Sequence, residues 1–396
     1  MNNMSLCLLK ATLAITLTIG SVAASAQVAS GIPIAQNQQR SSANPRLVRM
    51  TVGEGRGKII AVVAPAAVYE SSDEGSSFNH IADISFRAGA TKVCCAVLYE
   101  MPRSVGSIAA GTLLYSADFC DHGVMSTDIY SSHDQGRNWN FLSAPVRGGT
   151  CKEGKAVKND GLWEPEFVIS EDGALVMFWS DETDPCCSQK LSQIRTFDGA
   201  TWQDKKDTVA LRNRAARPGM AVVSRTPHGF YFMTYELCGV ANCDVMYRTS
   251  RDGWNFGPVA DTGRKIVTRS GRYFEHAPRN IWFGSRPGDD EFEAGGPMQG
   301  ELLVIGQVLH EREGAVSQED GEIIFKNSAE DGSGEWTSAP SPVKVPHAAA
   351  NNYNVCQNYS SSLLPVREGT ELLELASDLN AQGVCASYYA TEPFRP

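Results

Sequence analysis

The segment SHDQGRNW at residues 132–139 decides the fold, because SSDEGSSF at residues 71–78 matches it at the serine, aspartate, glycine and aromatic positions. In such a segment the aspartate accepts hydrogen bonds from turn amides, and the glycine supplies a backbone angle with φ > 0. The aromatic side chain then pins the turn to its sheet. Degenerate copies follow at residues 196–202, 250–256 and 331–336. Each copy predicts a tight turn between two strands.

A second sequence pattern repeats in step with these aspartate turns. Six times a glycine turn opens into an apolar strand, at residues 57–63, 111–115, 173–179, 229–235, 300–305 and 369–375. Each of the first five precedes one aspartate turn, and the sixth is followed only by the C-terminal segment. Short strands repeated with glycine turns at this period are typical of a β-propeller with four-stranded blades. The sequence therefore predicts an all-β, six-bladed β-propeller, since a two-sheet sandwich would rarely need so many strands.

The chain has 396 residues, which one propeller can hold as a single domain because each blade packs only against its neighbours. Residues 1–26 are expected to be a signal peptide, since Lys10 precedes an apolar run and small residues offer a cleavage site near Ala26. Residues 27–44, rich in Gln, Asn and Ser, are expected to form a flexible lead-in, and residues 45–396 the propeller. We therefore expect a secreted protein, extracellular or periplasmic.

The net charge restricts the classes of binding partner, and the cysteine content indicates disulfides rather than metal ligands. The net charge is −10 without a basic run, which argues against nucleic acid and membrane surfaces. Ten cysteines remain after the signal peptide, and an even number in an exported chain favours disulfides. Cys238 and Cys243 flank a short turn and are the best candidates for a local bridge. No Cys-x-x-Cys or Cys/His spacing supports zinc, so we expect no metal. We also expect no cofactor, and a monomeric protein.

In a propeller the innermost strand of each blade lines the central channel, so the starts of these strands converge on one pocket. We expect these starts at residues 45–46, 98–100, 163–166, 217–219, 275–278 and 358–359. Second strands return to the same face at residues 180–181, 235–236 and 377–378. Carboxylates, arginines and tyrosines that meet in a concave site are typical of a carbohydrate pocket.

Two carboxylates are the candidates for catalysis. Glu164 stands at the mouth of an inner strand, and Glu236 ends an apolar strand that would hold it against a low-dielectric surface. Such a surface raises the pKa of a carboxyl group and lets it donate a proton near neutral pH, while a more polar partner stays ionised and can attack. A single Glu at a strand end is more often a solvated edge residue, and it is the six-fold phase that favours catalysis here.

The same residues carry a resemblance to a known family. The strings WEP at 163–165, SDxxDP at 180–185, QKL at 189–191, RPGM at 217–220 and MTYE at 233–236 resemble family-93 glycoside hydrolases. Those proteins are secreted six-bladed propellers with Asp-box turns, within the sialidase-like superfamily, and act as exo-arabinanases on α-1,5-linked L-arabinan. The strings LYEMP at 98–102 and GTLL at 111–114 are also similar to that family's second blade.

The resemblance implies a retaining exo-glycosidase that releases arabino-oligosaccharide, with Glu164 as nucleophile and Glu236 as general acid/base. Tyr359 matches a pocket tyrosine of the last blade. The resemblance further implies that sugar hydroxyls are bound by Arg46, Asp181, Lys190 and Arg217. His276, at an inner-strand start, is a further candidate for substrate binding, although its place beside Pro278 favours a satisfied turn histidine over a catalytic base. Cys186-Cys187-Ser188 replaces the small polar loop expected of the family, which puts the exact substrate in doubt more than the reaction.

Two other functions remain open. A sialidase needs three arginines around a carboxylate, and Arg46, Arg217 and Arg279 would supply only a weak triad. A propeller lectin would keep the fold without the chemistry. Because a lectin should repeat its binding residues, the differing strand starts favour a single asymmetric pocket.

Overall fold

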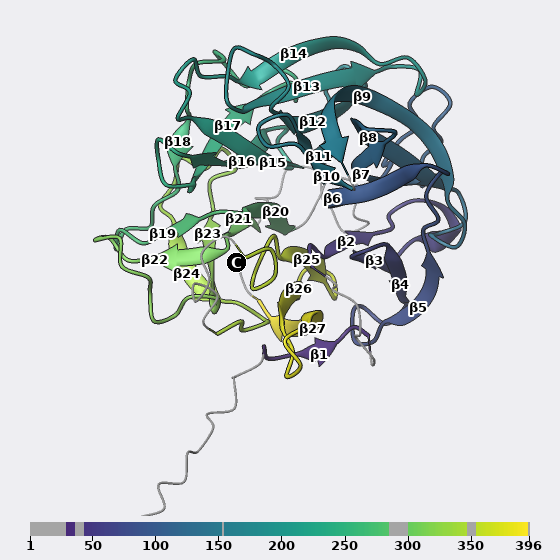
Figure 1. Cartoon of the computed structure of the whole chain (residues 1–396). Helices are drawn as coiled ribbons and strands as arrows, with labels where there is room; N and C mark the ends of the chain where they lie inside the picture. Colours follow the sequence, from purple (N-terminus) through teal and green to yellow (C-terminus); the bar gives the residue numbers. More distant parts are fainter. Residues whose placement is uncertain (1–28, 36–42, 153, 285–299, 347–353, 395–396) are drawn as a thin grey trace, which may run out of the picture.

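The computed structural model describes residues 29–35, 43–152, 154–284, 300–346 and 354–394, which form six antiparallel sheets around a central axis (Figure 1). The first blade contains β2 (Arg46–Arg49), β3 (Ile59–Val63), β4 (Ala67–Ser71) and β5 (Asn79–Asp83), with a 3₁₀ turn at Gly53–Gly55. The second contains β6 (Ala90–Glu100), β7 (Leu113–Asp121), β8 (Val124–Ser132), β9 (Asn140–Lys152) and β10 (Lys155–Ala156). The third contains β11 (Leu162–Ile169), β12 (Leu175–Asp181), β13 (Lys190–Thr196) and β14 (Gln203–Val209).

The remaining three blades complete the circle. The fourth contains β15 (Arg217–Arg225), β16 (Tyr231–Cys238), β17 (Asp244–Ser250), β18 (Arg264–Lys265), β19 (Tyr273–Glu275) and β22 (Val308–His310). The fifth contains β20 (Arg279–Gly284), β21 (Gly300–Ile305), β23 (Ile323–Asn327) and β24 (Thr337–Pro340). The sixth contains β25 (Ser362–Val366), β26 (Glu371–Leu379), β27 (Cys385–Pro393) and the N-terminal β1 (Ile32–Pro33). The predicted six-bladed β-propeller is confirmed.

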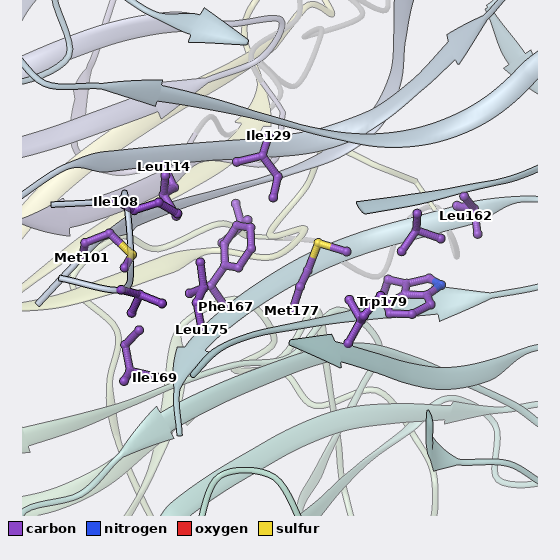
Figure 2. Close-up of a cluster of buried hydrophobic side chains, with 14 of the residues drawn as sticks. Met101, Ile108, Leu114, Ile129, Leu162, Phe167, Ile169, Leu175, Met177 and Trp179 are labelled. Atoms are coloured by element: carbon purple, nitrogen blue, oxygen red, sulfur yellow. The ribbon is translucent and has the colours of Figure 1, made fainter. Parts of the chain in front are cut away.

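The six innermost strands close the ring. β2 contacts β6, and the contacts continue through β11, β15, β20 and β25 back to β2. Each pair of adjacent blades buries its own group of apolar side chains. Figure 2 shows the group between the second and third blades, where Leu114 and Ile129 meet Phe167, Met177 and Trp179. Because every sheet is covered on both faces, its strands read as continuous apolar runs rather than alternating ones.

The predicted Asp-box turns link the third and fourth strands of their blades. Ser132 Oγ donates to Asp134 Oδ1 at 2.8 Å and accepts the amide of Gly136 at 2.9 Å. The amide of Asn138 donates to the same carboxyl oxygen of Asp134 at 2.9 Å. The turn at residues 71–78 repeats these contacts, and those at 196–202 and 250–256 keep most of them. The sequence pattern therefore marked real hairpins.

The sixth blade has no such turn because its fourth strand comes from the other end of the chain. Its third strand, β27, pairs with β1 from the other end of the chain, with Ile32 opposite Tyr389. The segment predicted to be a flexible lead-in thus includes the strand that closes the ring, and Ala29 and Ile34 are buried there. The polar composition of residues 27–44 hid this short apolar stretch.

One predicted inner-strand start is wrong. Leu98 to Glu100 lie at the end of β6, not at its beginning, and Glu100 pairs with Leu113 at the start of β7. The position equivalent to the other blades is Cys95, where the pairing of β6 with β7 is interrupted between Cys94 and Val97. The apolar run at residues 96–98 continues a longer strand, which shifted the prediction by several residues.

The predicted signal peptide, residues 1–26, lies outside the described residues. Within the part of the chain that the structure describes, no helix is long and apolar enough to cross a membrane.

Candidate active site

One residue with positive φ stands at the same point of each inner strand. These residues, called the channel ring below, are Asn44, Cys95, Glu164, Met220, Ala277 and Ser360, with φ between 48° and 60°. In β6, β11 and β15 the residue sits in a break of register, and in the other blades it lies two residues before the strand begins. A bulge of this kind re-aims side chains, and left-handed backbone at non-glycine residues is concentrated at functional sites.

Glu164 is the channel-ring residue of the third blade. Its backbone amide donates to Asp118 Oδ2 at 2.9 Å, which fixes the turned backbone. Its carboxyl Oε2 accepts the hydroxyl of Ser180 at 2.6 Å and the amide of Met220 at 3.1 Å. Burial within the protein, followed by the charge of Glu236, raises the pKa of Glu164 to about 7. Two donors on one oxygen still favour its ionised form.

Glu236 comes from the neighbouring blade, near the end of β16. Its Oε2 accepts the amide of Ala277 at 3.0 Å and lies 3.1 Å from Nδ1 of His276. The side chain is only 8 % exposed, and burial raises the pKa of Glu236 to about 7. Burial also lowers the pKa of His276, which favours its neutral form. Glu236 is thus held by a backbone amide and an imidazole.

Tyr359 completes this cluster from the sixth blade. It packs against Met220 and Ala277 in a small buried group, and its ring centroid is 5.6 Å from that of His276. Burial raises the pKa of Tyr359, and the charges of Glu164 and Glu236 raise it further. The structure therefore brings four sequence-predicted residues, Glu164, Glu236, His276 and Tyr359, to one desolvated site at the channel mouth.

Beneath the channel ring lies a group of charges. Arg46 and Arg279 line a narrow cavity with Glu164 and Glu166. Arg279 pairs with Glu166 at 3.0 Å, while Arg46 donates to the carbonyls of its neighbour Pro45 and of Ser360. Burial, followed by the charge of Arg279, lowers the pKa of Arg46. The sequence did not single out Glu166, although it lies two residues after Glu164 just as Arg46 lies two after Asn44.

Arg217, Lys190 and Asp181 stand at strand ends of the third and fourth blades: Asp181 ends β12, Lys190 begins β13 and Arg217 begins β15. Arg217 pairs with Glu182 and donates to Oε1 of Gln189 at 2.7 Å. Lys190 binds Asp184 at 2.6 Å and Asp207 at 2.7 Å. Asp181 is buried, and its carboxyl accepts from Thr183 and Lys205. These three predicted residues are thus held in pairs beside the cluster, and Glu182 rather than Asp181 faces Arg217.

Two buried groups escaped the sequence analysis. Asp118, in the apolar strand β7, accepts the hydroxyl of Thr127 at 2.9 Å as well as the amide of Glu164. Its pKa is raised well above the ordinary value, chiefly by burial. Ser180 was noted only as part of a motif, yet its hydroxyl binds the carboxylate of Glu164. A charged residue within an apolar strand was the signal that could have found Asp118.

All ten predicted cysteines are paired, and the Cys238–Cys243 bridge is confirmed. Cys94–Cys95 and Cys186–Cys187 join adjacent residues, while Cys120–Cys151 and Cys356–Cys385 span longer loops. Cys238 Sγ lies 3.5 Å from Oε1 of Glu236, so this bridge supports the candidate site directly. Among the residues that the structure describes, no group of three or more His, Cys, Asp or Glu side chains could hold a metal ion.

No protein-family model matches the chain, and no curated protein sequence is significantly similar to it. Solved structures do resemble it. The GH93 α-L-arabinofuranosidase of Fusarium graminearum, in complex with arabinobiose, superposes with a TM-score of 0.71 and 21 % identity over 93 % of this chain and 98 % of that one.

Two further structures extend the comparison. The Penicillium chrysogenum α-L-arabinanase complexed with arabinobiose gives 0.69 and 23 %, over 92 % of this chain and 96 % of that one. The NanB sialidase of Streptococcus pneumoniae is more distant, with a TM-score of 0.51 and 10 % identity over 92 % of this chain and 70 % of that one. The resemblance seen in the sequence is therefore confirmed in the fold, a six-bladed β-propeller that this chain shares with the GH93 structures.

Proposed function

We propose that this protein is a secreted retaining exo-glycosidase that releases arabino-oligosaccharide from the end of α-1,5-L-arabinan. The observation that carries the proposal is the pair Glu164 and Glu236, which belong to different blades yet share one desolvated site and have pKa values raised to about 7. Two carboxyl groups that repel each other hold one proton between them near neutral pH. A glycosidase needs this state, with one carboxylate ionised and the other protonated.

The hydrogen bonds support this division of roles between Glu164 and Glu236. Ser180 and Met220 both donate to Oε2 of Glu164, which stabilises its ionised form and leaves Oε1 to attack the anomeric carbon. Glu236 keeps the proton and delivers it to the glycosidic oxygen as the bond to that oxygen breaks. Water then attacks the glycosyl–Glu164 ester and gives its proton to Glu236, which frees Glu164. A separation of about 5 Å between the carboxyl groups is what this retaining route requires.

The other predicted residues have supporting roles in this proposal. Tyr359 and His276 line the sugar site beside the two carboxylates, and Arg217 and Arg46 bind sugar hydroxyls at its edges. Asp181 and Lys190 act through the loop that they hold. The arginines favour a neutral substrate over a sialoside, because Arg279 is paired with Glu166 and Arg217 with Glu182. Bound arabinobiose in two GH93-like propellers supports a pentose chain as substrate.

Export and a monomeric state belong to the same proposal. Five disulfides support folding in an oxidising compartment, because thiols stay reduced in the cytosol.

The test is a substrate panel for the purified mature protein: linear α-1,5-arabinan, sialosides and aryl glycosides, with chromatography of the products. We expect small arabino-oligosaccharides from arabinan, with retained anomeric configuration by NMR. Release of sialic acid would assign a sialidase instead. No hydrolysis across the panel would contradict the proposal and favour the lectin-like alternative.

A further inference from the structure

A cavity of about 350 Å³ lies outside the channel, among the loops of the third blade. Asn159 and Asp160 line it from the segment before β11, the loop after β12 supplies Glu182 and Cys187, and Arg214 comes from the segment before β15. Leu162 pairs with Asp181, so these loops leave the sheet at the end where Glu164 stands. The volume falls in the usual range for small-molecule sites, roughly 300–1,000 Å³.

Two side chains connect this cavity with the catalytic pair. Glu182, in its wall, accepts the amide of Gly161 at 3.0 Å and pairs with Arg217. Arg217 in turn begins β15 and pairs with Cys238 of β16, two residues along that strand from Glu236. Arg217 therefore connects a wall residue of the cavity, Glu182, with the two strands that hold the general acid.

A disulfide between adjacent residues shapes the opposite wall. Cys186 and Cys187 are bonded to each other, with Cys186 exposed and Cys187 buried against the cavity. The amide of Cys186 donates to Asp184 at 2.9 Å, and Arg214 donates to the carbonyl of Cys187 at 3.3 Å. Ser188 also binds the carbonyl of Arg214. The covalent ring fixes this part of the wall, so a sugar can lie against it without any loop being ordered first.

The polar groups of the cavity indicate the charge of its ligand. Carboxyl and amide oxygens dominate the lining, and they accept hydrogen bonds from hydroxyl groups. Two of the carboxylates already have cations, Glu182 with Arg217 and Asp184 with Lys190 at 2.6 Å. Arg214, which lines the cavity, is a third cation, against the three carboxylates Asp160, Glu182 and Asp184. The charges therefore balance, and neither a cationic nor an anionic ligand meets an excess of opposite charge. A neutral sugar fits this balance.

We propose that this cavity is a second carbohydrate subsite, which binds a neutral sugar residue of the leaving-group part of the substrate chain. The inference rests on the proposed function, because a general acid must stand beside the departing oxygen. The leaving group then lies on the side of Glu236, and Arg217 places the cavity on that side. The subsite adds binding energy for long chains without touching the bond that breaks.

The experiment compares chain lengths. Arg214→Ala removes part of the wall, and the double substitution Cys186→Ser/Cys187→Ser removes the rigid surface. Arg212→Ala is the matched control, since Arg212 is exposed in the same segment and does not line the cavity. We expect both cavity variants to raise KM for arabinohexaose about ten-fold with kcat unchanged, and to alter arabinotriose by less than about two-fold. The control should match the wild type.

Three results would overturn the inference: equal losses on the triose and the hexaose, no loss on the hexaose, or the same loss in Arg212→Ala. Thermal unfolding of Arg214→Ala shows whether the comparison concerns folded protein, even where the double variant does not fold. If the wild type cleaves no arabinan, the proposed function fails separately. Calorimetric titration of Glu236→Gln with arabinohexaose or a neutral galactan hexaose then measures sugar binding without cleavage. Binding that is lost when Arg214→Ala is added, but kept when Arg212→Ala is added, supports the subsite. No binding of either sugar to Glu236→Gln contradicts it.

Discussion

In this propeller the pKa values of carboxyl groups at the outer turns are lowered, and those of carboxyl groups at the channel mouth are raised. At the turn of residues 250–256, burial raises the pKa of Asp252, but the amides of Asn255 and Trp254 outweigh it and lower this pKa to about 2. At the mouth, burial raises the pKa of Glu236 to about 7, and one backbone amide offsets little of that rise. The contrast shows what sets the charge state of a carboxyl group within one fold. It is the number of hydrogen-bond donors to that group and its access to water.

The two regions therefore do different work. The outer turns use ionised aspartates to hold hairpins together, and the proposed chemistry does not depend on them. The mouth keeps carboxyl groups where a proton is retained near neutral pH, at a cost in stability. Substitutions in the two regions should consequently separate activity from folding.

The largest expected effect is on activity at the mouth. Glu164→Ala and Glu236→Ala should each lower kcat on arabinan by at least about a thousand-fold, because each removes a group that acts on the bond being broken. Initial rates by reducing-sugar release measure this loss. Asp134→Ala, which breaks an outer turn, is the matched control and should change kcat by less than about two-fold. Near wild-type activity in either glutamate variant would remove the assignment.

The pH dependence of kcat/KM should follow the same pair. Activity needs Glu164 ionised and Glu236 protonated, so the rate should fall about ten-fold per pH unit on both sides of an optimum near pH 7. Repulsion between the two carboxylates splits the two protonation steps around that value. An optimum between pH 4 and 5, the range of ordinary carboxyl groups, would contradict the shared site.

Removing a charge at the mouth should stabilise the fold. The pKa of Glu236 rises from 4.5 to about 7 on folding, so the unfolded state ionises first as the pH rises. The resulting loss of stability builds up between pH 4.5 and 7 and is complete above pH 7. Glu236→Gln should raise the free energy of unfolding at pH 8 by on the order of 1–3 kcal/mol, and the gain should shrink toward pH 4.5. Urea unfolding at both pH values measures it. A variant less stable than wild type at pH 8 would show that the carboxylate is well compensated.

The smallest expected effect belongs to the outer turns. Asp134→Ala removes hydrogen bonds from Ser132 and from the amide of Asn138, which should cost about 1 kcal/mol of stability at pH 7. The pKa of Asp134 is lowered on folding from an ordinary value of 3.8, because hydrogen bonds from Asn138 and Ser132 outweigh burial. Its contribution is therefore present above that value and lost as the pH falls below it. A cost that does not change between pH 7 and pH 2.5 would contradict this view of the turn.

The turns and strands were predictable because their chemistry is local. Ser132, Asp134 and Gly136 bind one another within a few residues, so their spacing alone identified the hairpin. The closing strand β1 was missed because Ile32 has a partner only in Tyr389, at the other end of the chain. Cys95 was missed as an inner-strand start because a register break leaves no mark in the order of apolar residues.

The site was predictable in its carboxylates but not in their partners. Glu164 and Glu236 stand at strand ends, which the six-fold phase revealed. The groups that bind them come from other strands and blades, such as Ser180 and the amides of Met220 and Ala277. Glu182 was overlooked beside Asp181, because a shift of one residue at a strand end turns a side chain to the other face.

The most direct test of the shared site is an NMR titration of protein labelled with ¹³C at the glutamate carboxyl groups, with the two resonances assigned from Glu164→Gln and Glu236→Gln. Both groups should titrate near pH 7 in the wild type, and replacing Glu236 should bring the titration of Glu164 to a lower pH. Two midpoints near 4.5 that ignore each other would contradict the account.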